Sequence, residues 1–188
     1  MSNLEKDPRE TVCGGLATVS AEPTRRVLSP REVPLGGPRA MLVRRTLPHR
    51  ELRTIGAWCF VDDYGPSDVG GTVGMQVPPH PHTGLQTVTW LLEGEVRHED
   101  SLGSRVLVRP GELSLMTAGR GISHAETSPV RHPPLLRGVQ LWVALPDAAR
   151  HGDPRFAHHP DLPVVEDADL RATVIVGTLA GAVSPARA

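Results

Sequence analysis

Two short pairs of residues with metal-ligating side chains stand out in this sequence: His80 with His82, and His124 with Glu126. The two residues of each pair are two positions apart, and residues i and i+2 of a β-strand point to the same face of a sheet. If the two strands lie side by side in a barrel, all four side chains converge on one point inside it. Three imidazoles and one carboxylate, without a thiolate, suit a divalent iron, manganese, cobalt, nickel or copper ion. The sequence therefore predicts a metal site.

A single histidine in a strand is more often a hydrogen-bonded core or surface residue than a ligand. Two pairs with the same spacing favour the metal interpretation. Pro78, Pro79 and Pro81 also restrict the backbone around the first pair, which lowers the entropy cost of holding ligands in place.

The elements that must position these residues are short strands. From residue 39 onward, strand-like runs alternate with turns that contain Gly or Pro, which is typical of an all-β sandwich or barrel. Helical signals are weak and allow one turn at 147–151 and another at 166–170. Residues 1–38 show little periodicity and predict an irregular N-terminal lead-in. The expected strands cover residues 41–47, 57–62, 72–77, 86–92, 95–99, 105–108, 113–117, 122–126 and 137–145.

Length and charge exclude several classes of protein. A chain of 188 residues is long enough for one ordinary domain with a core. Its formal charge of −1 gives no electrostatic reason to expect direct binding of nucleic acid or of an anionic membrane. The N-terminus lacks the apolar stretch of a signal peptide, and no run approaches the length of a transmembrane helix. We expect a soluble, cytoplasmic protein.

Other polar features are expected to be structural. The arginine pairs at 25–26 and 44–45 have no interleaved aromatic residues and are expected on the solvated surface, as is His98, which lies in a polar segment. Cys13 and Cys59 are far apart and form no Cys-x-x-Cys pair, which argues against a disulfide framework or a zinc knuckle.

The segments around the ligand pairs resemble the sequence signatures of the pirin family, a branch of the cupin superfamily. Residues 79–89, PHPHTGLQTVT, are similar to the family's PHPHRGFETVT, and residues 92–95, 100–103 and 116–126 are similar to its other signatures. The resemblance covers residue 39 to the C-terminus. It implies a jelly-roll-like cupin β-barrel over residues 39–165 and an iron ion held by His80, His82, His124 and Glu126.

The chain departs from the pirin pattern at three positions beside the ligands. Thr83, Leu85 and Gln86 stand where the family has Arg, Phe and Glu. They are not ligands in pirins, so we expect them around the metal or at the mouth of its pocket, where they would alter substrate preference or the tuning of the metal.

The chain is also shorter than the resemblance implies, because pirins consist of two barrels that face one another. Residues 166–188 are similar to the opening of the second barrel, so we expect one complete barrel and the remnant of another. An apolar strand at 172–177 would form an exposed edge unless it folds back or pairs with another chain, which makes a homo-oligomer a hypothesis.

The resemblance implies an enzyme. Four protein ligands leave two positions of an octahedral Fe(II) ion open, which suffices for a bidentate anionic substrate such as a flavonol, or for one substrate oxygen and dioxygen. We therefore expect a metal-dependent dioxygenase of the quercetin type. Glu126 would be both a ligand and the base that takes the 3-hydroxyl proton. The loop at 83–85 would line the pocket mouth, whereas Trp142 is expected in the core.

The alternative is a non-catalytic iron protein. Pirins are also described as regulators that bind a protein partner, an enzyme or a transcription factor, and respond to the redox state of the iron. A change from Fe(II) to Fe(III) adds one charge to the site, which can shift the equilibrium of a nearby loop. Turnover and an enclosed pocket would favour the enzyme, whereas an accessible metal face would favour the regulator.

Overall fold

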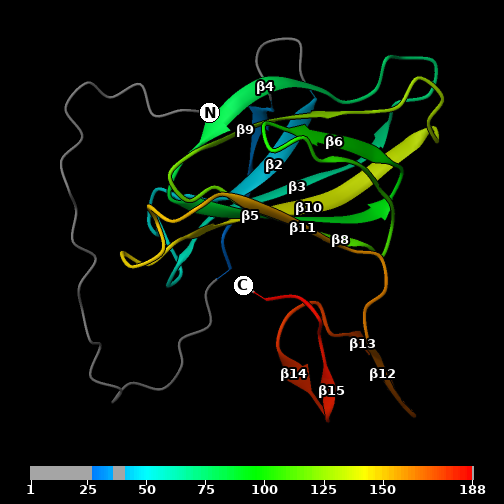
Figure 1. Ribbon diagram of the computed structural model, residues 1–188. Helices are drawn as coiled ribbons and strands as arrows, with labels where there is room; N and C mark the ends of the chain where they lie inside the picture. The colour runs from blue at the N-terminus through cyan, green and yellow to red at the C-terminus, as the bar shows by residue number, and fades with distance from the viewer. Residues whose placement is uncertain (1–26, 36–40, 188) are drawn as a thin grey trace.

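The computed structural model describes residues 27–35 and 41–187, and these residues form strands, turns and loops (Figure 1). The larger sheet contains β1 (Arg31–Pro34), β2 (Leu42–Leu47), β3 (Trp58–Asp68), β5 (Leu85–Glu93), β8 (Leu113–Thr117), β10 (Leu135–Ala144) and β11 (Arg155–His159). The smaller sheet contains β4 (Gln76–His82), β6 (Val96–Asp100), β7 (Arg105–Val108) and β9 (Ile122–Thr127). Two short C-terminal hairpins pair β12 (Val164–Asp167) with β13 (Leu170–Thr173), and β14 (Thr178–Leu179) with β15 (Ala182–Val183).

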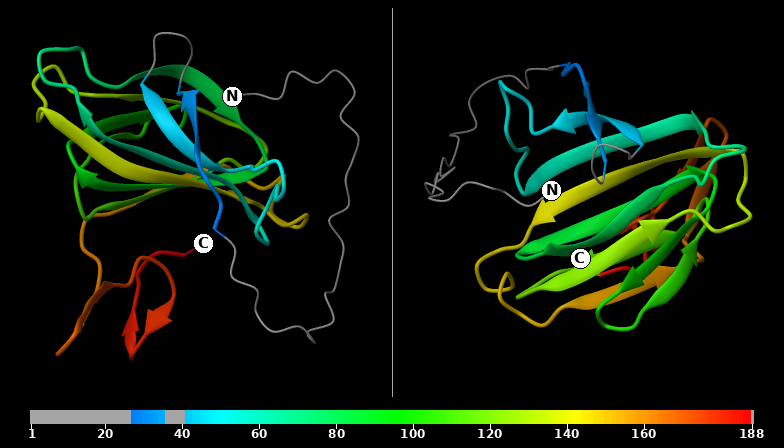
Figure 2. Two further views of the ribbon diagram at one scale, coloured as in Figure 1. Left: turned by 180° about the vertical axis from the view of Figure 1, so that it is seen from behind. Right: turned by 90° about the horizontal axis from the view of Figure 1, so that it is seen from above.

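The two main sheets lie face to face as a flattened antiparallel barrel (Figure 2). The strand order is β1-β2-β3-β10-β5-β8-β11 in the larger sheet and β4-β9-β6-β7 in the smaller one. Strands close in sequence are often not neighbours in the sheets, so the barrel is held by pairings between distant segments. The expectation of an all-β cupin fold is confirmed. Among the described residues, no helix has the length and apolar character needed to cross a membrane.

Strand β4 carries the first histidine pair although Pro78, Pro79 and Pro81 belong to it. Proline has no amide hydrogen to donate to a neighbouring strand, so prolines are tolerated at the edge of a sheet. Strand β4 is such an edge, because it pairs with β9 on one side only. The register of this pairing places His80 directly opposite His124.

Apolar side chains from both sheets fill part of the space between them. Fully burying one such side chain stabilises the fold by about 1.5–3 kcal/mol. This cluster draws on both sheets and on the segment before β4, and its buried members are Val43, Tyr64, Val69, Met75, Val77, Leu91, Val96, Val108 and Leu136.

The chain beyond β11 folds back onto the outer face of the larger sheet, below the barrel in Figure 1. Val88, Leu113 and Leu115 point outward there and pack with Ile175 and Ala186 of the C-terminal segment. This cover explains why β5 and β8 are buried on both faces. Within the apolar segment at 172–177, Val174 is buried and Ile175 packs in this cluster, whereas Val176 is exposed. The assignment of residues 166–188 to a second barrel, and the homo-oligomer, stay predictions.

Several expected elements differ from the observed ones. Residues 31–34 form strand β1 within the expected irregular lead-in, because they pair with β2. The strand expected at 72–77 begins only at Gln76 and continues to His82, and β11 was not expected. Residues 166–170 belong to the β12–β13 hairpin and make no helical turn, since their backbone groups pair across strands. Residues 147–151 do form a single turn, closed by the Arg150 amide on the Pro146 carbonyl.

Candidate metal centre

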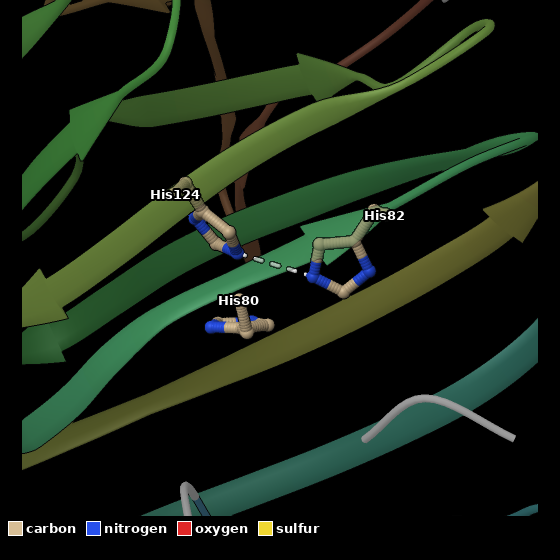
Figure 3. Close-up of side chains that lie close together, drawn as sticks. All are labelled: His80, His82 and His124. Carbon is tan, nitrogen blue, oxygen red and sulfur yellow. Dashed lines mark hydrogen bonds between the residues drawn. The ribbon is translucent and has the colours of Figure 1, made fainter. Parts of the chain in front are cut away.

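Three of the four predicted ligands meet on the inner face of the smaller sheet (Figure 3). His80 and His82 come from β4 and His124 from β9, and their ring centroids lie 4.5–5.1 Å apart. The Nε2 atoms of His82 and His124 are 3.2 Å apart. One ligand atom from each of the three histidines lies within 4.8 Å of the others. The i, i+2 spacing and the β4–β9 pairing together produce this cluster.

His80 is oriented by its own strand. Its Nδ1 lies 2.9 Å from the Pro78 carbonyl oxygen and donates to it, which leaves Nε2 available to bind a metal ion. Metal-binding histidines usually donate their other ring N–H in this way, which fixes the tautomer and the orientation of the ring.

His82 and His124 are uncharged at neutral pH. Burial, reinforced by the neighbouring His124 and His80, lowers the pKa of His82 from 6.5 to about 3. Burial also lowers the pKa of His124 to about 3, with His80 and His98 as further causes. An uncharged imidazole offers the nitrogen lone pair that a metal ion needs. The donor set present therefore fits a divalent cation.

Glu126 follows His124 at i+2 on β9 and is buried beside the histidines. The side-chain amide nitrogen of Gln140, on β10, donates to both Glu126 oxygens at 3.2 Å. Glu126 forms a second possible metal-binding group with His124 and His98. Burial raises the pKa of Tyr64, and the negative charge of Glu126 adds to the effect, so the Tyr64 hydroxyl stays protonated. Gln140 carried no signal in the sequence that would have indicated its role.

His98 is buried, so the expectation that it lies on the surface is wrong. It is 4% exposed and stacks on Phe156, with ring centroids 4.2 Å apart. Its Nε2 donates to Asp100 Oδ2 over 3.1 Å. The strand alternates with Arg97 and Glu99 outward and Val96 and His98 inward. This period-two alternation was the signal in the sequence, but the overall polarity of the segment obscured it.

A cavity of about 200 Å³ opens next to the histidines. Trp142, 8% exposed, forms one of its walls and packs edge-on against Phe60. Trp142 is thus both a core residue, as expected, and a cavity residue. The other lining residues are Pro34, Leu35, Arg45, Val77, Pro78, His80, His82, Glu126 and Gln140.

Arg45 also lines this cavity and is 6% exposed, so the expectation that it lies on the solvated surface is wrong. Its guanidinium makes a bidentate pair with Asp62 over 2.7 and 2.6 Å and lies over the Phe60 ring. The buried carboxylate explains how a charged side chain can face inward. Arg44, its neighbour, points outward and is exposed as expected. The pair at 25–26 lies outside the described residues.

The three positions that depart from the pirin pattern do not line this cavity. Thr83 is exposed in the loop after β4, and Leu85 is half-buried at the start of β5. Gln86 donates to Thr117 and lies on the same face of β5 as Val88, which belongs to the outer cluster. Alternation along the strand therefore turns Gln86 away from the cavity. The influence of Thr83 and Leu85 on the metal stays a prediction.

Acid is expected to destabilise the metal-free protein through this cluster. The pKa of His82 and of His124 is lowered from the ordinary 6.5 to about 3 in the folded chain, so between these values the unfolded chain binds more protons. Stability should therefore be fully present above about pH 6.5 and fall as the pH is lowered. Urea unfolding at pH 7.5 and 5.5, with a chelator present, measures the loss.

The matched variants are His82→Gln and His151→Gln, since His151 is exposed. His82→Gln should show a smaller loss of stability between the two pH values than the parent protein, and His151→Gln the same loss as the parent. Equal losses in all three proteins would contradict this assignment.

The fold and the donor set together define an all-β cupin barrel with a histidine- and carboxylate-lined centre. The family profile described as Pirin matches residues 40–143, and the chain belongs to the pirin family. The resemblance noted in the sequence is thereby confirmed.

Three similar proteins place the chain within this family. A Pseudomonas aeruginosa protein named "Putative quercetin 2,3-dioxygenase" is 46% identical over 159 residues, which are 84% of this chain and 49% of that protein. Human pirin is 38% identical over 115 residues, 61% of this chain and 37% of pirin. The crystal structure of a quercetin 2,3-dioxygenase from Acinetobacter baumannii is similar with a TM-score of 0.80 and 48% identity, over 85% of this chain and 52% of that one. The chain thus spans about half the length of these relatives, or less.

Proposed function

We propose that this chain is a metal-dependent oxidoreductase, a dioxygenase that opens the ring of quercetin or a similar flavonol with O2. The observation that carries the proposal is the convergence of three imidazoles, two of them held uncharged, and a buried carboxylate beside a cavity with an aromatic wall. Similarity to proteins named for quercetin dioxygenation supports the substrate class.

His80, His82, His124 and Glu126 are the residues that would hold the metal. Fe(II) is the proposed ion, and nitrogen and oxygen donors of this kind also accept manganese, cobalt, nickel or copper. When bound, the metal supplies Lewis acidity that lowers the pKa of a coordinated substrate hydroxyl.

The side chains of the cavity bind and orient the substrate. Trp142 offers a flat apolar surface to an aromatic ring, and Arg45, whose charge is balanced by Asp62, offers a guanidinium N–H to a substrate oxygen. Glu126 accepts the proton of the 3-hydroxyl, and Gln140 holds its carboxylate in one orientation while it does so.

The size of the cavity limits how much of the substrate it encloses. Pockets that enclose drug-sized ligands measure about 300–1,000 Å³, and this one measures about 200 Å³. We therefore expect the cavity to enclose only the chelating end of a flavonol. The substrate is thus recognised mainly by its hydroxyl and carbonyl oxygens and by one ring.

Oxygen uptake tests the proposal. Protein loaded anaerobically with Fe(II) is mixed with quercetin in an oxygen electrode, while the flavonol absorbance is followed in parallel. We expect oxygen and flavonol to disappear together in a one-to-one ratio. The controls are metal-free protein and the same concentration of Fe(II) without protein, because free iron can oxidise flavonols by itself. Protein that binds one iron per chain and consumes no more oxygen than the iron control would contradict the dioxygenase proposal.

The alternative, a redox-responsive regulator that binds a partner protein, remains a hypothesis based on the sequence alone. No observation at the site favours it over turnover.

A further inference from the structure

Behind His124, on the side away from the cavity, lies a second imidazole that the proposed chemistry does not use. His124 directs Nε2 toward His82, and its Nδ1 lies 3.5 Å from Nδ1 of His98, at the outer limit of a hydrogen bond. The two rings are 5.3 Å apart between centroids. His98 in turn contacts Asp100 through its own Nε2. The three side chains form a row that begins at a carboxylate and ends at a predicted metal ligand.

The carboxylate at the end of this row is fixed in place. Asp100 Oδ1 accepts the backbone amides of Leu102 at 2.9 Å and Ser104 at 3.0 Å, so Oδ2 is left for His98. Burial alone would raise the pKa of Asp100, but the hydrogen bonds from His98, Ser104 and Leu102 outweigh it and hold the pKa below its usual range. Asp100 is therefore a carboxylate that can only accept hydrogen bonds, and His98 must donate to it from Nε2.

The direction of the other hydrogen bonds in the row follows from the fact that the Asp100 carboxylate can only accept. An uncharged imidazole carries one N–H and one lone pair. In the uncharged form of His98 that donates from Nε2, Nδ1 carries only a lone pair, so this form accepts a hydrogen bond from His124 Nδ1–H. His124 then has its lone pair on Nε2, the atom that faces His82 and His80. The row therefore selects the tautomer of His124 that can bind a metal on the cavity side.

We propose that His98 and Asp100 are positioning residues that fix the tautomer and ring orientation of His124 for metal binding. The inference rests on the proposed metal centre and adds to it two residues outside the predicted ligand set. Outer hydrogen-bond partners of metal-binding histidines raise metal affinity about 10- to 100-fold.

A ligand role for His98 is the competing interpretation, because His98, His124 and Glu126 also form a possible metal-binding group. Two observations favour positioning. The ring of His98 is held flat against Phe156. Its Nε2 is occupied by Asp100, whose own position is fixed by the turn that follows.

Nitrogen-15 NMR of the metal-free protein tests the tautomers directly. We expect His124 to be protonated on Nδ1 and His98 on Nε2. In Asp100→Asn, whose side chain can also donate, this preference should weaken at both rings. His124 protonated on Nε2 in the parent protein would overturn the proposal without any variant.

Cobalt(II) titration by calorimetry, with the visible absorption of the bound ion as a second readout, tests the consequence. His98→Leu removes the acceptor of the His124 Nδ1–H hydrogen bond and should lower the affinity for cobalt about 10- to 100-fold. His98→Asn places an amide oxygen near the position of Nδ1 and should recover most of the affinity, whereas His98→Gln, which reaches Asp100 only, should not. His158→Leu removes a histidine of β11 that is hydrogen-bonded to Ser114 and should leave affinity unchanged.

The outcomes separate the two proposals. A parent protein that binds no cobalt would refute the metal centre itself. A parent protein that binds one cobalt ion, with a folded His98→Leu variant that binds it equally tightly and with the same spectrum, would overturn only the positioning role. Two ions per chain, reduced to one in His98→Leu, would make His98 a ligand and also overturn it.

Discussion

Replacing His82 with alanine is expected to abolish tight binding of a divalent metal ion. His82 supplies one of three imidazoles that meet at the candidate centre, and its Nε2 lies 3.2 Å from that of His124. The loss of an outer hydrogen-bond partner alone costs about 10- to 100-fold in metal affinity, so the loss of a ligand should exceed about 100-fold. Calorimetric titration with Ni(II) or Co(II) measures the change.

The matched control is His151→Ala, an exposed histidine of the turn after β10. It should bind the metal like the parent protein. His82→Ala should remain folded, because the imidazole it removes is uncharged and half-buried and contributes to no apolar cluster. Parent-like affinity in folded His82→Ala would remove His82 from the ligand set.

Replacing Asp62 with alanine is expected to destabilise the fold by about 3–5 kcal/mol, because it leaves the buried guanidinium of Arg45 without its counter-charge. Asp62 is 0% exposed and Arg45 6% exposed. Urea unfolding at pH 7.5 measures the free energy of unfolding.

The chain contains its own control for this prediction. Arg44 and Asp63, the neighbours of Arg45 and Asp62 on the same two strands, form an exposed ion pair. Asp63→Ala should cost no more than about 1 kcal/mol, because exposed ion pairs contribute little. The double variant Arg45→Met with Asp62→Leu should recover part of the lost stability, since it removes both buried charges. Equal losses in Asp62→Ala and Asp63→Ala would contradict a special role for the buried pair.

The family and the fold class could be predicted from the sequence because both depend on local patterns. Short strand-like runs between Gly and Pro turns predict an all-β protein, whatever the order of the strands in the sheets. The histidine pair of β4 and the His-x-Glu pair of β9 each place two ligand types on one face of a strand, whichever strand is the neighbour. The strand limits were less predictable. Strand β4 runs through three prolines because it lies at a sheet edge, which is a property of the assembled sheet.

The sequence by itself determined which residues could bind a metal, since donor chemistry and i, i+2 spacing belong to the chain. Only the tertiary structure decided what surrounds them. Arg45 looked like a surface residue because it belongs to an arginine pair without interleaved aromatic residues, and His98 because its segment is polar. Arg45 is buried because Asp62, on a neighbouring strand, balances its charge. His98 is buried because Asp100, on the inner face of the same strand, accepts its hydrogen bond. Burial of a polar group depends on a partner at a fixed distance, and only the assembled sheets enclose each residue together with that partner.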